Sequence, residues 1–179
     1  MNTLDALATR RSTRKYLPQQ VEKEKIDIIL KAAYAAPVGH SAYKDLHIAV
    51  VQNAELLQKT AAYCSKAFGN AAYNPFYGAP TLIIVSAKPK ADQQLVYIAD
   101  VGCVMENMQL AATELDLGCV YLWAMLNRIP QYPELIEALK LPEGYQAISA
   151  LALGYPETPL TPRTLADIPA GKIATEFID

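Results

Sequence analysis

The spacing of apolar residues along this chain alternates several times between the pattern typical of a helix and the pattern typical of a strand. The clearest helical pattern lies in residues 22–35, where Ile26, Ile29, Leu30 and Ala33 recur at the spacing of one helix face. Pro37 then ends the pattern, because proline cannot continue a helix. Shorter stretches predict three further helices, over residues 3–8, 55–66 and 130–139.

Four short apolar runs predict strands. Residues 81–85 form a continuous apolar run, which is typical of a strand buried on both faces. The other three runs cover residues 47–51, 119–123 and 147–153. Since the chain has no internal repeat and no linker, we expect a single α+β domain over residues 1–179, in which helices surround a sheet of about four strands.

The longest pattern covers residues 91–117, which contain no proline and are apolar on nearly every side. Such a helix has to be buried, either inside the domain or across a subunit interface. Asp100, Glu106 and Asn107 interrupt the pattern, and each needs a polar partner in those surroundings. Gly118 is expected to cap the end of the helix.

Composition narrows the classes of protein to consider. The chain has 179 residues, 52% of them hydrophobic and 19% charged, which suits a globular domain with a large core. A net charge of −2 disfavours general binding to DNA or RNA backbones. No run reaches the roughly 18 apolar residues of a membrane span, and the N-terminus lacks the apolar stretch of a signal peptide. We therefore expect a cytoplasmic protein with no nucleic-acid or membrane partner.

Cysteine, histidine and several catalytic motifs exclude further classes. Cys64, Cys103 and Cys119 include no C-x-x-C pair, so neither a disulfide framework nor a zinc site is expected, and Cys103 reads as a packing residue. His40 and His47 have no carboxylate or cysteine at metal-ligand spacing, so no metal site is predicted. The signatures of serine hydrolases, P-loop proteins, zinc proteases and Rossmann dinucleotide sites are also absent.

Candidate chemistry begins in residues 10–14, which read Arg-Arg-Ser-Thr-Arg. Three guanidiniums this close repel one another unless a negative group lies between them, and their planar donors match phosphate oxygens. If the segment is extended after Ser12, Ser12 and Arg14 share one face while Thr13 points away. The segment is either a phosphate site with a second cation beside it or a solvated basic turn after a short helix.

With these residues as its first motif, the chain resembles the FMN-dependent nitroreductase family over nearly its whole length. Further segments match in the family's order: Ala-Ala-Pro-Val-Gly at 35–39, Tyr-Gly-Ala-Pro at 77–80, Asp-Val-Gly at 100–102, Glu-Asn-Met-Gln-Leu-Ala-Ala at 106–112, Leu-Asp-Leu-Gly at 115–118, Leu-Pro-Glu-Gly at 141–144 and Leu-Gly-Tyr-Pro at 153–156.

The resemblance implies a three-layer α+β sandwich, with a central, mainly antiparallel sheet of about four or five strands flanked by helices. It also implies an intertwined homodimer with two FMN sites in the subunit interface. Arg10, Arg11 and Ser12 would bind the cofactor on its phosphate side, with Arg163 as a second phosphate candidate or an exposed tail charge. Arg14 would lie near the N1/C2 edge of the flavin ring.

The remaining site residues also follow from the resemblance. A backbone N–H near Trp123 and Ala124 would point at flavin N5, although Trp123 could equally be a core aromatic. Three residues of the partner chain, Pro37, Val38 and Gly39, would wrap one face of the ring. The next residues depart from the family pattern of side-chain amides, so Ser41 or backbone groups would replace those amides.

Two residues of that same loop, His40 and Tyr43, would line the substrate pocket or cover the dimer seam. The implied activity takes hydride from NADH or NADPH and reduces a nitroaromatic, a quinone or a similar small electron acceptor by a ping-pong mechanism. The cofactor carries the chemistry, so no catalytic side chain is expected. Two alternatives remain: a non-catalytic flavin store or sensor, and a dimeric scaffold whose basic turn binds an anionic partner.

Overall fold

The structure is a computed structural model that describes residues 1–90, 95–127 and 132–178. Its centre is a four-stranded sheet made of β1 (Leu46–Val51), β2 (Thr81–Ala87), β3 (Gly118–Leu122) and β4 (Gln146–Gly154). The strand order is β1-β2-β4-β3, and every neighbouring pair is antiparallel. All residues of β2 are buried, which confirms the expectation of a strand covered on both faces.

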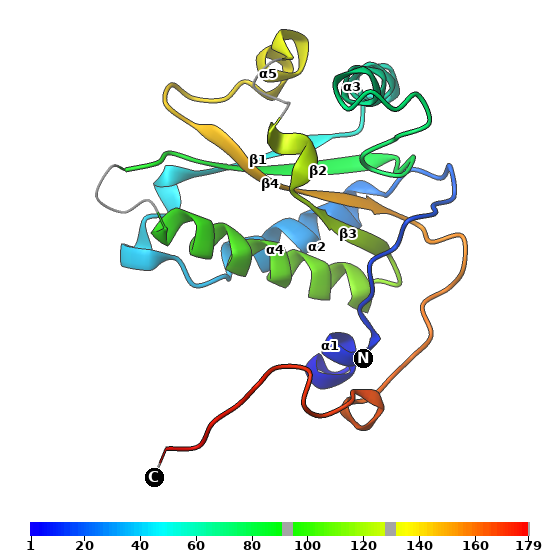
Figure 1. The fold of residues 1–179 in the computed structure, drawn as a ribbon, viewed down its shortest axis with the longest axis vertical. Helices are drawn as coiled ribbons and strands as arrows, with labels where there is room; N and C mark the ends of the chain where they lie inside the picture. Colours follow the sequence, from blue (N-terminus) through cyan, green and yellow to red (C-terminus); the bar gives the residue numbers. More distant parts are fainter. Residues whose placement is uncertain (91–94, 128–131, 179) are drawn as a thin grey trace.

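Helices cover both faces of this sheet, as Figure 1 shows. One face carries α2 (Lys23–Tyr34) and α4 (Val96–Glu114), and the other carries α3 (Ala54–Ala67) and α5 (Pro133–Leu139). Each face has its own apolar cluster, with Ile83 and Val85 of β2 facing α4 and Leu82 and Ile84 facing the opposite layer. The predicted three-layer α+β arrangement is therefore confirmed.

Two helices, α1 (Thr3–Thr9) and α3, begin at an asparagine side-chain cap. The Asn2 side chain accepts a hydrogen bond from Asp5 N–H at the start of α1, and Asn53 accepts one from Leu56 N–H at the start of α3. The predicted helix over residues 91–117 is observed as α4, while its first residues, 91–94, lie outside the described part. Residues 130 and 131 of the predicted helix over 130–139 also lie outside it.

Gly118 does not cap α4, contrary to the expectation from sequence. After α4 the left-handed residue is Asp116, with a φ of 58°, and Gly118 opens β3 instead. A Cβ atom at Gly118 would lie 2.6 Å from Cγ2 of Thr13, so any larger residue there would force Thr13 to shift. The glycine therefore serves the close approach of residues 12–14 to the sheet.

The chain after β4 runs back past α1, where a 3₁₀ turn at Leu165–Asp167 packs against that helix, and then extends away from the body (Figure 1). Ile173, Phe177 and Ile178 in this tail are 81%, 90% and 96% exposed. Among the described helices, none is both long and apolar enough to cross a membrane.

Candidate functional site

Three polar residues of α4 hold three separate segments against the helix. Asp100 Oδ1 accepts a 2.8 Å hydrogen bond from Gly39 N–H, and Asn107 Nδ2 donates to the Ala32 carbonyl at 3.0 Å. Glu106 Oε1 lies 3.4 Å from Nε of Arg10. The polar partners expected for this apolar helix are therefore present, and they fix the loop after α2 and the basic segment.

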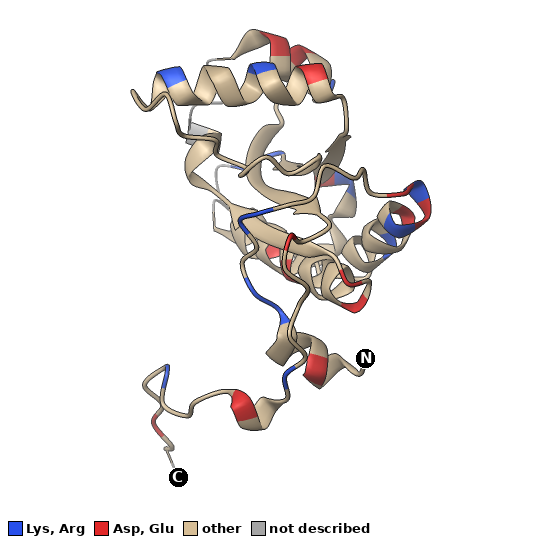
Figure 2. Cartoon of the chain, turned by 90° about the vertical axis from the view of Figure 1, so that its right-hand side faces the viewer, with Lys and Arg blue, Asp and Glu red and all other residues tan. Residues whose placement is uncertain are grey.

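The basic segment leaves α1 at Arg10 and runs extended beside β3. Thr13 N–H donates to the Cys119 carbonyl at 2.9 Å, and Ser12 forms a parallel bridge with the same residue. Thr13 is buried, whereas Ser12 and Arg14 are exposed, so these two side chains share one face as expected. Figure 2 shows the basic residues along this extended stretch above α1.

The cations of this segment differ in their partners. The Arg11 guanidinium donates to the carbonyls of Thr158 at 2.9 Å and Pro159 at 3.1 Å, and Lys15 pairs with Glu157 at 3.7 Å. Arg10 Nε is buried and, within the described residues, makes no hydrogen bond. An open cavity of about 260 Å³ lies along the segment, lined by Arg11, Ser12, Thr13, Arg14, Lys15 and Thr158.

Arg163 lies close to the start of this segment although it is far away in sequence. Its backbone N–H donates to Oγ1 of Thr9 at 3.0 Å, and the Thr9 hydroxyl donates to its carbonyl at 3.3 Å. The Arg163 guanidinium donates to the Asp167 carbonyl at 3.3 Å. The fold thus brings the late basic residue to the residue that precedes Arg10.

The loop after α2 presents His40 and Ser41 to solvent, both in left-handed backbone conformation with φ of 55° and 53°. Gly39 packs tightly on α4, since a Cβ there would lie 2.8 Å from Cγ1 of Val96. Pro37 is exposed and Val38 half-buried. The need for glycine at position 39 is thus explained within one chain by contact with α4.

The Tyr43 hydroxyl donates to the Ala36 carbonyl at 3.1 Å, which fixes the ring across the loop. Its ring lines a cavity of about 150 Å³ between α2, the sheet and α4, together with Ala33, Tyr34, Leu46, Ile48, Val85 and Val104. Tyr43 is therefore beside an apolar space, as expected for a pocket residue, while its role toward a substrate stays a prediction.

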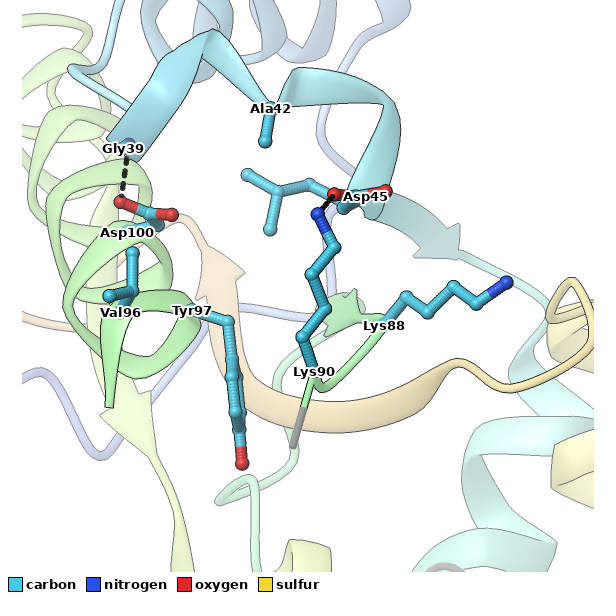
Figure 3. A pocket seen from close by; sticks show the side chains of 9 residues that line it. Gly39, Ala42, Asp45, Lys88, Lys90, Val96, Tyr97 and Asp100 are labelled. Carbon is cyan, nitrogen blue, oxygen red and sulfur yellow. Dashed lines mark hydrogen bonds and ion pairs between the residues drawn. The ribbon is translucent and has the colours of Figure 1, made fainter. Parts of the chain in front are cut away.

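A smaller cleft behind the same loop, drawn in Figure 3, measures about 20 Å³, which is room for about one water molecule. Lys90 Nζ lies 2.5 Å from Oδ2 of Asp45 across it, and the hydrogen bond from Lys90 lowers the pKa of that carboxyl. Asp100 and Gly39 form its opposite wall. This cleft lies where the loop packs against the residues after β2, and it is too small for a cofactor.

Trp123 directly follows β3 and is 62% exposed, so the interpretation of Trp123 as a core aromatic is wrong for the single chain. Ala124, which begins a 3₁₀ turn at Ala124–Asn127, is exposed as well. The exposure arises because β3 is an edge strand of the sheet and ends before Trp123. Both residues therefore remain open to contact from a ligand or a second chain.

Two titratable groups near the basic segment, the Cys119 thiol and the Tyr16 hydroxyl, stay protonated. Burial raises the pKa of the Cys119 thiol to about 12, which keeps it protonated and unreactive. Burial also raises the pKa of Tyr16, whose hydroxyl donates to the Thr13 carbonyl at 2.8 Å. Among the residues that the structure describes, no group of three or more His, Cys, Asp and Glu is placed to hold a metal ion.

The predicted site residues fall into two groups within one chain. Residues 10–14 lie near Glu106 on α4, while the 37–41 loop lies near Asp100, six residues earlier and about 9 Å away along the helix axis. Sequence reasoning gave no role in the site to Glu106 or Tyr77. Their contacts with Arg10 and Arg14 are long-range, so no local pattern could reveal them.

Comparison with known proteins identifies relatives of this arrangement. A family model described as the nitroreductase family matches residues 7–155. A protein of Archaeoglobus fulgidus with the provisional name NADH dehydrogenase/NAD(P)H nitroreductase is 35% identical over 156 residues, which cover 86% of this chain and 85% of that protein. The NADPH-flavin oxidoreductase of Vibrio harveyi is 25% identical over 98% of this chain and 73% of its own length.

Solved structures agree with the sequence matches. A Bacteroides fragilis nitroreductase with bound FMN has a TM-score of 0.82 and 29% identity, over 99% of this chain and all of that chain. A Desulfitobacterium hafniense nitroreductase with bound FMN has a TM-score of 0.79 and 27% identity, over 94% of this chain and 98% of that chain. The resemblance inferred from the sequence is confirmed.

Proposed function

Since this chain belongs to the nitroreductase family, we propose that it is an FMN-dependent oxidoreductase. It takes reducing equivalents from NADH or NADPH and passes them to a small acceptor such as a nitroaromatic or a quinone, in a ping-pong sequence. The observation that carries the proposal is the basic segment 10–14, fixed beside β3 with Ser12 and Arg14 directed to one cavity of about 260 Å³.

The donor set fits the phosphate of FMN. Within the described residues, Arg10 has a buried Nε without a hydrogen bond, and Ser12, two residues further on, is exposed with a hydroxyl that can donate. Arg163, whose backbone N–H is bonded to Thr9 at the end of α1, would supply a further guanidinium. A dianion bound here would offset the repulsion between these cations, and guanidinium–phosphate pairs are among the stronger polar contacts in proteins.

The residues that would face the ring come from other elements. Arg14 would supply a positive charge to the ring, and the backbone at Trp123 and Ala124, two exposed residues after β3, would supply hydrogen-bonding groups. FMN, when bound, supplies the hydride chemistry, so the chain needs to bind, orient and exclude water.

A second copy of the chain completes the site in this proposal. Apolar side chains of α1 and α4, including Leu4, Leu7 and Ile98, and the tail residues Phe177 and Ile178 are exposed, and a second copy of the chain would cover them. The partner would bring Pro37, Val38, Gly39 and Ser41 to the ring, with His40 and Tyr43 toward the substrate. We thus propose a cytoplasmic homodimer, each chain folding as one domain over residues 1–179.

The deciding experiment is the visible absorption spectrum of the purified protein, repeated after anaerobic addition of NADH and then NADPH. We expect flavin bands that bleach with at least one nucleotide and return on addition of a quinone or a nitroaromatic compound. Bands that persist with both nucleotides would instead indicate a flavin store or sensor. A protein that is colourless and does not bind added FMN would refute the proposal.

A further inference from the structure

Arg14 has surroundings unlike those of the other cations near it. In the described part of the chain its guanidinium meets no carboxylate and no carbonyl, whereas Arg10, Arg11 and Lys15 each do. Instead it contacts an aromatic ring, since its Cζ lies 5.7 Å from the ring centroid of Tyr77. At this distance the cation is attracted by the negative face of the ring.

Tyr77 reaches Arg14 through an unusual backbone conformation. Its φ is 58°, in the left-handed region that a bulky residue rarely adopts, and the next residue, Gly78, is also left-handed at 74°. The residues beside this turn, Phe76 and Ala79, are almost fully buried, and Ala79 N–H donates to the Phe76 carbonyl at 3.0 Å. The turn is therefore held from both sides, and the strained conformation directs the Tyr77 ring outward.

The backbone below Arg14 is fixed as firmly. Thr13 N–H is bonded to β3, and the Tyr16 hydroxyl donates to the Thr13 carbonyl at 2.8 Å. Tyr16 itself packs against Gly154, where a Cβ atom would lie 3.0 Å from its ring. With both anchors fixed, the ring of Tyr77 limits where the long, exposed Arg14 side chain places its charge.

An aromatic ring suits this task better than a carboxylate. A carboxylate would neutralise the guanidinium and occupy its in-plane N–H donors. A ring contact leaves the full positive charge and donors available to a ligand. The 260 Å³ cavity lined by Ser12 and Arg14 is where such a ligand would lie.

We propose that Tyr77 is a positioning residue that holds the Arg14 guanidinium against the bound flavin and thereby raises the flavin's reduction potential. This inference rests on the proposed function. A cation fixed beside the flavin ring would stabilise the negative charge that FMN gains on reduction. A cation free to move into solvent would stabilise that charge less. Tyr77 therefore acts on the difference in affinity between reduced and oxidised FMN rather than on binding as a whole.

The test compares the Tyr77→Asn variant, which removes the ring and keeps a side chain that tolerates a positive φ, with the Tyr77→Phe variant, which keeps the ring. The measured quantities are the dissociation constant of oxidised FMN and the midpoint potential of bound FMN. For Tyr77→Asn we expect the preference for reduced over oxidised FMN to fall about tenfold, which corresponds to a potential about 30 mV lower. Tyr77→Phe should keep the potential of the wild type.

A double-mutant cycle shows whether Tyr77 acts through Arg14. In an Arg14→Gln background, Tyr77→Asn should leave the potential unchanged, because the charge it positions is already gone. Tyr77→Gly gives the same comparison should the asparagine variant not fold, since glycine adopts this conformation without strain.

The possible outcomes distinguish a failure of this inference from a failure of the proposed function. Wild-type protein that binds FMN, with a Tyr77→Asn variant of unchanged potential, overturns the role of Tyr77 alone. A Tyr77→Phe variant that shifts as far as Tyr77→Asn overturns it too, because the hydroxyl rather than the ring would then be responsible. A wild type that binds no FMN overturns the proposed function and this inference with it.

Discussion

Arg10 and Arg11 are adjacent in sequence but meet different partners. Nη2 of Arg11 donates to the Thr158 and Pro159 carbonyls, whereas Nε of Arg10 is buried beside Glu106 without a hydrogen bond from any described residue. We expect Arg10→Ala to weaken FMN binding roughly tenfold to 150-fold, the effect of about 1.5–3 kcal/mol for a hydrogen bond to a charged group. Arg11→Ala should change it less than about threefold, because Nη2 of Arg11 already donates to two backbone carbonyls.

Fluorescence titration of the flavin-free variants with FMN measures both dissociation constants. Arg11→Ala is the matched control, since it removes the same charge from the neighbouring position. Equal losses of affinity in the two variants would mean that net charge alone attracts the phosphate, and the assignment of Arg10 would then be withdrawn. Circular dichroism on both variants checks that α1 and the segment after it remain folded.

The orientation and partners of a single residue could be predicted from the sequence only where its contacts are local in the chain. The alternation of Ser12, Thr13 and Arg14 follows from an extended backbone, so which side chains point outward was predictable and is confirmed. The partners of Arg11 and Arg14 lie far along the chain, at Thr158 and Tyr77, and no periodicity encodes them. The positive φ of His40 and Tyr77 was hidden for a similar reason, because surrounding structure imposes it.

The basic segment packs closely against β3 because residue 118 is a glycine and has no side chain. Gly118 faces Thr13 so closely that the Cβ of alanine would lie 2.6 Å from Cγ2 and 2.8 Å from Oγ1. We expect Gly118→Ala to lower the free energy of unfolding by about 1–3 kcal/mol, as overpacking commonly does, and to weaken FMN binding by displacing Ser12 and Arg14. Urea denaturation and FMN titration on the same sample measure the two effects.

A control for this substitution is Gly102→Ala in α4, where the added Cβ would meet no described atom within 4 Å apart from its chain neighbours and the helix's own backbone. In the monomer that change should leave the unfolding free energy the same or raise it by up to about 1 kcal/mol, because alanine favours a helix more than glycine does. If Gly118→Ala were as stable and bound FMN as tightly as wild type, the packing of residues 12–14 on β3 could not be what positions the site.

Elements were predictable where hydrophobic pattern and burial coincide. The run at residues 81–85 gave β2, and the face of Ile26, Ile29 and Ala33 gave α2, because both bury those residues in the single chain. Trp123 and Gly118 were harder, since each depends on where β3 ends against its neighbours rather than on its own residue type. An exposed tryptophan after an edge strand is a tertiary outcome, and residue type alone favours a buried one.

At the scale of the whole molecule, some apolar side chains are exposed instead of packing in the core. Ile98 of α4 is 49% exposed and has the exposed Leu95 and the half-buried Gly102 as neighbours along the helix. Ile28 of α2 is 48% exposed but has Glu24, Lys25 and Lys31 at the corresponding positions. The two isoleucines have nearly the same exposure and opposite surroundings, so only Ile98 resembles part of a subunit interface.

This pair tests the homodimer directly. We expect Ile98→Asp to raise the dimer dissociation constant at least about tenfold, because association would bury an unpaired carboxylate, and Ile28→Asp to leave it unchanged. Analytical ultracentrifugation across a dilution series measures the constant. Because each FMN site is proposed to include the 37–41 loop of the partner, Ile98→Asp should also release FMN as the dimer dissociates. A monomeric wild type that retains FMN would contradict a shared site, and equal effects of the two substitutions would move the interface away from α4.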